Sequence, residues 1–230
     1  MNEDKQRQLD YRFADANDVP ELAALFRRCM PHSLWVQLGS KFTELYIRHY
    51  CTSSTAAAVV AATDSVLLGG CTGAVDPDHD RYRFYKENGW DLVRLLAAET
   101  MVRPSVASPL LSRLARGARQ AGTQVARRLL HATPQHDAQD GEKELLAADA
   151  SKTCAIATIF VDPNARGHGI AAHMLRRFTQ QMAARGFAYC RAGTTADNIA
   201  SQRSLQRAGF RCVGRSGAHM TYLCPLAGSI

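Results

Sequence analysis

The chain has 230 residues, 46% of them hydrophobic, so it is long enough to bury one sizeable core. Its formal net charge is +7, and no apolar run approaches the length that would span a bilayer. Seven cysteines are scattered singly, without C-x-x-C pairs or histidines at ligand spacing, which argues against a disulfide framework and a structural zinc site. We therefore expect free thiols and no metal. Because the first residues are charged and lack an apolar core, we also expect a cytoplasmic protein.

The N-terminal residues predict a strand followed by a helix. Residues 9–13 alternate between apolar and polar side chains, which is typical of a strand. Asp18 and Glu21 flank a proline in the pattern of a capped helix start, with the aspartate as cap and the glutamate at the third helical position. Pro31 is expected to end that helix.

A second helix and a hairpin of strands are expected next. The helix begins near Ser33 or Ser40. Its apolar face carries Phe42, Leu45, Tyr46 and His49 or Tyr50. Residues 56–62 and 66–75 are short apolar runs separated by a turn, which predicts two buried strands.

Residues 77–151 form the segment that fits the least with a compact core. Their first two thirds have a helical pattern that prolines interrupt, and residues 133–149 are polar and acidic, as in a linker. Residues 81–131 hold ten arginines and lysines against three acidic residues, and this excess of seven equals the net charge of the chain. A solvated helical face is the simplest interpretation. Contact with a membrane surface or an anionic acceptor stays open, whereas nucleic acid is not expected, because no nucleic-acid fold signature accompanies the charge.

A strand, a glycine-rich turn and a helix follow. Residues 154–161 are apolar and rich in β-branched side chains, and Asp162-Pro163-Asn164 ends them. Gly167-His168-Gly169 then opens a helix. The apolar face of that helix consists of Ile170, Met174, Leu175, Phe178 and Met182. Glycines let a ligand approach the backbone, and the first amides of a helix attract anions, so this loop suits a phosphate or pyrophosphate.

Several phosphate-binding families use such a loop. A dinucleotide-binding Rossmann unit is disfavoured, because five residues separate the strand from the first glycine and Tyr189 stands where an acidic residue is expected. A Walker loop is excluded, since no Gly-Lys-Ser/Thr ends the run. A plain turn without a ligand would explain most isolated Gly-x-Gly matches.

Two ordered motifs resemble the GNAT superfamily of N-acetyltransferases. The run from Val161 to Ala171 resembles its acetyl-CoA motif, in which Arg166, Gly169 and Ala171 meet the pattern Arg/Gln-x-x-Gly-x-Gly/Ala. The run from Asp197 to Phe210 resembles the second signature of the family. The resemblance is close over residues 155–210 and looser over residues 11–76.

The resemblance implies an α+β fold of three layers. Its mixed, mostly antiparallel sheet is flanked by helices and splayed between its fourth and fifth strands. We expect one such domain over residues 1–230, with a basic helical insertion at about residues 77–151. The last strands, near residues 212–214 and 219–224, pair as a hairpin or with a partner chain, which leaves a homodimer open.

The resemblance also implies site residues. Acetyl-CoA would be the acetyl donor and a primary amine the acceptor. The backbone of Ile159, Phe160 and Val161 would bind the pantetheine arm as a further strand would. The pyrophosphate would lie among Arg166, Gly167, His168, Gly169, Ile170 and Ala171. Asn198 would reach the cofactor through its amide, and a helix cap is an equally good interpretation of this residue.

The catalytic residues are not identified from the sequence. Family members often place a tyrosine seven residues after the asparagine to protonate the departing thiolate, and here that position is Leu205. His32, Glu44 and His219 are candidates by chemistry alone. Two hypotheses remain: an acetyl-CoA-dependent N-acetyltransferase for a small molecule, amino sugar or peptide amine, and a GNAT-fold module that binds acyl-CoA without turnover.

Overall fold

The computed structural model describes residues 9–64, 66–75, 77–102 and 152–226. The chain divides into two compact units, Met1–Glu87 with Gln139–Ile230, and Asn88–Ala138. All the described strands, and all the described helices except the second part of α4, belong to the first unit. The sheet and the site described below are therefore features of that unit alone.

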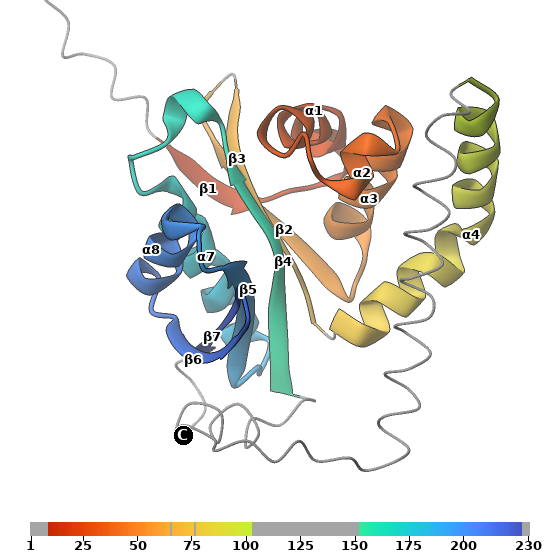
Figure 1. Cartoon of the computed structure of the whole chain (residues 1–230). Coiled ribbons are helices and arrows are strands. Elements are labelled where there is room, and N and C mark those ends of the chain that lie inside the picture. The colour runs from red at the N-terminus through yellow and green to blue at the C-terminus, as the bar shows by residue number, and fades with distance from the viewer. Residues whose placement is uncertain (1–8, 65, 76, 103–151, 227–230) are drawn as a thin grey trace, which may run out of the picture. The chain divides into compact units, whose positions relative to one another are not determined.

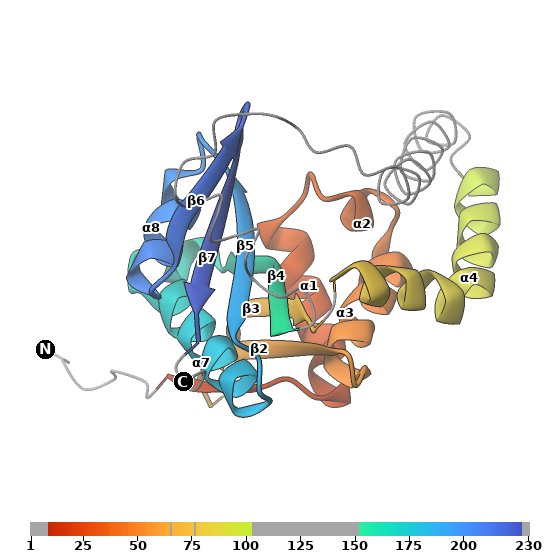
Figure 2. The same ribbon diagram turned by 90° about the horizontal axis from the view of Figure 1, so that it is seen from below.

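Within the described residues, seven strands form one sheet in the order β1-β2-β3-β4-β5-β7-β6. Neighbouring strands are antiparallel except β4 and β5, which are parallel. Figure 2 shows β5, β7 and β6 fanning away from β2, β3 and β4. The predicted mixed, mostly antiparallel sheet is confirmed. The strands are β1 Asp10–Phe13, β2 Ala56–Ala62, β3 Leu67–Ala74, β4 Thr153–Val161, β5 Tyr189–Thr195, β6 Arg211–Ser216 and β7 His219–Pro225.

Helices cover both faces of the sheet. In Figure 1, α1 and α3 lie on one face and α7 on the other. The strand β2 separates two cores, because its alternate side chains enter each of them: Val59 packs with α7, and Val60 packs with α1 and α3. Burial on both faces explains why this strand is a continuous apolar run. The helices are α1 Val19–Cys29, α2 Leu34–Gln37, α3 Ser40–Thr52, α4 Pro77–Val102, α7 Ile170–Ala184 and α8 Ile199–Arg207.

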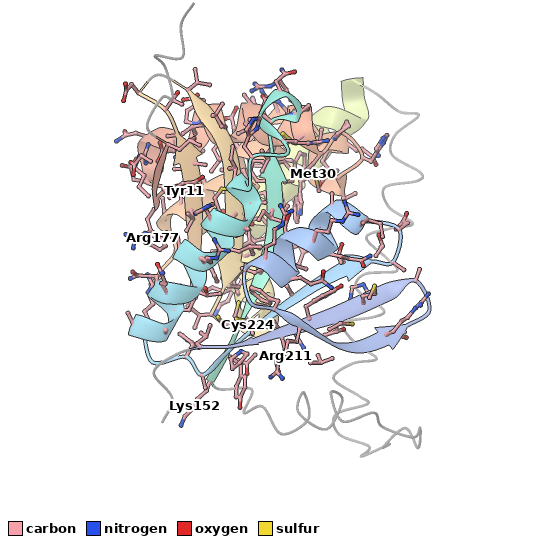
Figure 3. The ribbon with its side chains drawn as sticks, turned by 90° about the vertical axis from the view of Figure 1, so that its left-hand side faces the viewer. Tyr11, Met30, Lys152, Arg177, Arg211 and Cys224 are labelled. Atoms are coloured by element: carbon pink, nitrogen blue, oxygen red, sulfur yellow. The ribbon has the colours of Figure 1, made fainter. Side chains whose placement is uncertain are left out.

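The helix α7 sits close to β3 because that strand carries glycines beneath it. A β-carbon on Gly73 would lie 2.4 Å from the ring of Phe178, and one on Gly69 would lie 2.8 Å from the methyl group of Met174. All five residues of the predicted apolar face of α7 are buried. Tyr11 stacks on the ring of His173 in α7, and Figure 3 shows Tyr11 on the side of the molecule where α7 lies. These contacts hold the N-terminus of α7 in place beside the sheet.

The helix α1 starts at the predicted residues, with Asp18 as its N-cap and Glu21 in its first turn, but the contacts of their carboxylates differ from those of a capped helix. Asp18 makes no capping hydrogen bond to this helix; instead it accepts two hydrogen bonds of 2.7 Å from Arg12. Asp15 caps a 3-10 helix just before α1, and Asp18 completes that capping box. The carboxylate of Glu21 accepts a hydrogen bond from the amide of Leu67, at 2.8 Å, so it anchors the start of β3. The predicted position of the cap is therefore confirmed, while both carboxylates bind partners outside the helix.

The predicted helical segment after β3 is observed as α4 as far as Val102. Its first turns, up to Glu87, belong to the first unit, and residues 88–102 belong to the second. The remaining part of the predicted insertion, with its second helical pattern and acidic linker, lies outside the described residues. Among the helices that are described, none combines the length and the hydropathy of a membrane span.

Candidate active site

The strands β4 and β5 separate after a short paired stretch. Pairing is confined to three residues of each described strand, from Thr153 opposite Tyr189 to Ala155 opposite Arg191. Beyond Ala155, β4 continues to Val161 and pairs with β3 alone among the described strands, while β5 stays paired with β7. The sheet is therefore split, and one edge of β4 is open to a ligand within the described structure.

The open edge of β4 has backbone groups to offer. The amide of Asp162 donates to the carbonyl of Leu68, at 2.8 Å, so the alternate residue Phe160 also pairs with β3. Ile159 and Val161 consequently point their amides and carbonyls into the split. The carbonyl of Val161 accepts a hydrogen bond of 3.2 Å from Nε of Arg166. Three residues were expected to bind the pantetheine arm through their backbone. Of these, Ile159 and Val161 face the split, whereas the amide and carbonyl of Phe160 are used in pairing with β3.

A β-bulge marks the point where the strands diverge. Thr158 pairs with Thr72 and Ile156 pairs with Gly73, so Ala157 is an additional residue in β4. A bulge bends a strand and redirects its backbone groups. No sequence pattern indicates this bulge, since alanine occurs in regular strands and bulges alike.

The glycine loop, residues 162–169, leads from β4 into α7. Asp162 caps a 3-10 helix, Pro163–Ala165, and a hydrogen bond from the amide of Asn164 holds the pKa of its carboxylate below the usual value. Gly167 and Gly169 have φ angles of 89° and 76°, in the left-handed region that side chains with a β-carbon disfavour. A β-carbon on Gly167 would meet open space, and the nearest atom to one on Gly169 is 3.9 Å away. The loop thus leaves room on its outer side.

The N-terminus of α7 presents free backbone amides at the end of this loop. The first amide bonded back into the helix is that of His173, which donates to the carbonyl of Gly169 at 3.2 Å. The N-cap, Gly169, has no side chain that could satisfy the earlier amides, those of residues 170–172. His168 is exposed and near the carbonyl of Ala165, at 3.4 Å, and Ala171 is half-buried. A helix of fifteen residues with uncapped amides and an adjacent arginine favours an anion.

Two residues of the second motif have structural roles. The side-chain oxygen of Asn198 accepts a hydrogen bond of 3.1 Å from the amide of Ser201, so it caps α8. Leu205 is only 2% exposed and packs in the core that α7 shares with the sheet. A tyrosine at position 205 would have to displace core side chains, and the position that often carries an acid in the resembled family is here used for packing.

A cavity of about 500 Å³ lies at the paired end of the split, next to the bulge. We call it the aromatic cavity, because its walls include Trp35, Tyr46 and Phe84, together with His49, Asp80 and His219. Residues 155–157 of β4 form part of its lining. Of the three sequence candidates for acid–base chemistry, His219 lines this cavity, whereas His32 and Glu44 do not. The structure thus brings one of these candidates to the split.

The wall of the aromatic cavity also contains a buried contact between a histidine and an aspartate, which no sequence pattern indicated. Nε2 of His49 lies 2.9 Å from Oδ1 of Asp80, and each side chain is 4% exposed. The hydroxyl of Thr55 donates to the same carboxylate oxygen at 3.0 Å. Only the position of His49 on a buried helical face was predicted. Asp80 comes from α4, 31 residues further along the chain, and no spacing rule links the two.

Tyr46 is a second cavity residue whose role the sequence did not indicate. Its hydroxyl lies 3.2 Å from the hydroxyl of Thr158, next to the bulge, and its ring stacks on Trp35 at 4.8 Å. Burial raises the pKa of Tyr46 above its usual value, because desolvation disfavours the phenolate. The phenol therefore keeps its proton at neutral pH and can donate a hydrogen bond into the site.

His219 owes its position to a glycine on the neighbouring strand. A β-carbon on Gly193 of β5 would lie 2.8 Å from Cε1 of the His219 ring and 2.9 Å from Nε2. The imidazole thus lies across the backbone of β5, facing the aromatic cavity. It is more exposed than His49, which is closed in by α3 and α4.

Comparison with known proteins agrees with this geometry. Residues 137–210 match the acetyltransferase (GNAT) family. This stretch contains the open edge of β4, the glycine loop, α7 and α8. A comparison with curated protein sequences gives no match.

Solved structures show the same fold at low sequence identity. The PaiA N-acetyltransferase from Thermoplasma acidophilum, solved with coenzyme A, has a TM-score of 0.55 at 10% identity, over 95% of this chain and 99% of that one. The yncA protein from Salmonella typhimurium, solved with its cofactor acetyl-CoA, has a TM-score of 0.52 at 14% identity, over 95% and 94%. The ribosomal-protein-S18-alanine N-acetyltransferase from Escherichia coli has a TM-score of 0.51 at 10% identity, also over 95% and 94%. At these identities the likeness establishes the fold.

Proposed function

Because residues 137–210 match the acetyltransferase (GNAT) family, we propose that the protein moves an acetyl group from acetyl-CoA to a primary amine. The acceptor would be a small molecule, an amino sugar or a peptide amine. The observation that carries the proposal is the split sheet, with the glycine loop at one end and the aromatic cavity at the other. A donor and an acceptor that enter from these two ends would meet at the bulge of β4.

The residues around the glycine loop fit acetyl-CoA. Gly167 and Gly169 leave open space on the outer side of the loop, and the uncapped amides that follow suit the pyrophosphate. The binding residues would be Ile159, Val161, Arg166, Gly167, His168, Gly169, Ile170, Ala171 and Asn198. When bound, acetyl-CoA supplies an acetyl group activated as a thioester. The chain contributes backbone pairing along β4 and a positive field at the N-terminus of α7.

The aromatic cavity supports an acceptor site. It holds groups for both tasks that aminolysis of a thioester requires, a hydrogen-bond donor and a proton acceptor. Tyr46 offers its protonated hydroxyl, and His49 and His219 offer imidazoles. Orientation of the amine between aromatic walls can itself supply much of the lowering of the barrier.

A module that binds acyl-CoA without turnover is the competing function. The burial of Leu205 in the core supports it, because the acid that relatives often use at this position is missing. The polar groups of the aromatic cavity support the transferase. A module that only binds the cofactor needs no buried histidine–aspartate pair beside the place where the thioester is expected. We therefore favour the transferase.

Thiol release from acetyl-CoA tests the proposal. The protein is mixed with acetyl-CoA and, separately, with glucosamine, spermidine and a peptide with a free N-terminus, and the acetylated amine is identified by mass spectrometry. We expect amine-dependent release of thiol with at least one acceptor class. Calorimetric binding of CoA without amine-dependent release across the whole panel would favour the non-catalytic module. Absence of CoA binding would contradict both functions.

A further inference from the structure

We propose that His49 is the general base of the acetyl transfer and that Asp80 positions it. The inference rests on the proposed function, and it assigns the proton acceptor that the motifs left unidentified. Its starting point is a histidine and an aspartate that are almost completely buried, hydrogen-bonded to each other and at the wall of the aromatic cavity.

The hydrogen bond to Asp80 determines which nitrogen of His49 is free. A carboxylate only accepts hydrogen bonds, so we assign the hydrogen of this contact to Nε2 of His49, which lies 2.9 Å from Oδ1 of Asp80. A neutral imidazole with its hydrogen on Nε2 has a lone pair on Nδ1. Among the described residues, Nδ1 has no hydrogen-bond partner, and it is not one of the fully buried atoms that lack one. Since His49 lines the cavity, Nδ1 is the atom that can meet an acceptor amine.

The neighbouring groups keep the imidazole in this orientation. The rings of Tyr50 and Phe84 contact it nearly at right angles, with centroids 5.4 and 5.1 Å away. Thr55 donates to the same oxygen, Oδ1 of Asp80, at 3.0 Å, which gives the carboxylate a second anchor. Rigid support of this kind reduces the reorganisation that proton transfer would otherwise need.

The position of His49 in the cavity is right for the reaction. The lining of the same cavity includes residues 155–157 of β4, where the sheet splits and the bulge occurs. The open edge of β4 runs from this point to the glycine loop. An amine in the cavity can thus contact Nδ1 of His49 and face the end of the split where the thioester is expected.

The proton balance of the step is simple. The acceptor enters as a free amine, and its nitrogen forms a bond to the acetyl carbon while the carbon–sulfur bond breaks and its electron pair leaves with sulfur. His49 takes the proton that the nitrogen loses. It then returns that proton, through solvent, to the sulfur, so the products are the amide and a thiol, and His49 is neutral again.

Replacement of His49 gives the kinetic test. His49→Gln should lower kcat by about 10²–10⁴-fold with the amine that the unmutated protein acetylates fastest. CoA affinity, measured by calorimetry, should stay within about twofold, because the glycine loop is untouched. His32→Gln is the matched control, since His32 is exposed and not part of the cavity lining. A rate that survives His49→Gln in a folded protein would overturn the proposal.

The tautomer of His49 gives a test that needs no acceptor. In the unmutated protein, long-range ¹H–¹⁵N spectra of labelled histidine should show the hydrogen of His49 on Nε2, with His49→Gln identifying the signal. Asp80→Asn should shift the population towards the other tautomer and lower kcat more than it raises the KM of the amine. A role of Asp80 in folding alone would move neither the tautomer nor this ratio. A hydrogen on Nδ1 in the unmutated protein would contradict the assignment.

The pH profile separates His49 from its neighbours. The other titratable or charged groups that line the cavity are Tyr46, Tyr50, Asp80, Tyr85, Arg191 and His219. Protonation of the acceptor amine lowers kcat/KM at acidic pH in every variant, so we expect only the additional acidic limb to disappear in His49→Gln and to persist in His219→Gln. Persistence in both variants would refute the base. A lack of thiol release from the unmutated protein with every amine would refute the proposed function, and the base with it. Amine-dependent release that is equally fast in His49→Gln would refute the base and leave the proposed function standing.

Discussion

The two ends of the split sheet present different kinds of chemical groups to a ligand. At the glycine loop the groups on offer are backbone amides and carbonyls, and their exposure depends on two residues with positive φ, Gly167 and Gly169. In the aromatic cavity the groups are side chains that come from separate elements. Tyr46 meets Thr158 across 112 positions of the chain, and His49 meets Asp80 across 31. A backbone site can be recognised from one contiguous stretch, but a side-chain site has to be seen in three dimensions.

The most direct test of the backbone site is to place a side chain in the glycine loop. Gly169→Val puts a branched side chain beside the amides of α7 and should weaken CoA binding by more than tenfold, or about 1.4 kcal/mol. Gly186→Val is a matched control, because Gly186 has a φ of 88° just after the other end of α7, with open space around it. Both variants carry the same backbone strain, about 1–2 kcal/mol. Calorimetry with CoA should separate them, and equal affinities would mean that the loop is not the phosphate site.

The sequence predicted the fold well because the signals for it are local. Helical periodicity identified the buried face of α7, and alternation or short apolar runs identified the strands. The start of α1 was predicted at the right residues, with Asp18 as N-cap and Glu21 in the first turn. The capping hydrogen bonds were not found, since Asp18 pairs with Arg12 and Glu21 binds the amide of Leu67, which becomes a neighbour only in the folded chain.

The candidate site divides in the same way. The residues of the glycine loop were proposed from one motif, and their contact with CoA stays a prediction. The aromatic cavity was missed, because no spacing joins Asp80 to His49 or Tyr46 to the bulge at Ala157. The sequence also could not show that Leu205 is buried, since a leucine at this position of α8 is compatible both with a core residue and with a site that has lost its acid.

A smaller effect is expected from Tyr46→Phe, which removes one hydroxyl from the aromatic cavity. The change should lower kcat by up to about tenfold, because one hydrogen bond contributes about 1 kcal/mol. CoA affinity should not change.

The pH profile tests the same residue. Burial raises the pKa of Tyr46, so the phenol keeps its proton up to and beyond its usual pKa of 10.0. The loss of its proton can therefore only contribute an alkaline limb above that value. The shape of the profile below pH 10 should therefore be the same in both proteins, with Tyr11→Phe, outside the cavity lining, as control. A shifted limb near neutral pH would assign Tyr46 a different role.

The position of His219 can be tested from the strand beside it. Gly193→Ala places a methyl group 2.8 Å from the imidazole and must move the ring. We expect the KM of the amine to change by roughly threefold, about 0.7 kcal/mol, with little change in CoA affinity. Gly214→Ala on β6 is the control, because the nearest atom to its β-carbon is 4.0 Å away. Identical KM values in the two variants would remove His219 from the acceptor site.

The smallest effect is expected from the basic residues after α4, which lie outside the described residues. The triple replacement of Arg113, Arg116 and Arg119 by Gln should leave stability, CoA affinity and amine KM unchanged if these charges are merely solvated, since exposed charges contribute little. If they bind an anionic membrane, each lost charge should weaken binding by roughly 1 kcal/mol at low ionic strength, and the difference should shrink as salt is added. Sedimentation with phosphatidylserine vesicles measures this, and the corresponding Lys replacements, which keep the charge, are the control.

We expect weak, salt-sensitive association at most, because the apolar positions of the predicted helical pattern in this segment include no Trp or Phe. Tight binding to neutral vesicles that salt does not affect would show that apolar contacts, and not these arginines, carry the interaction.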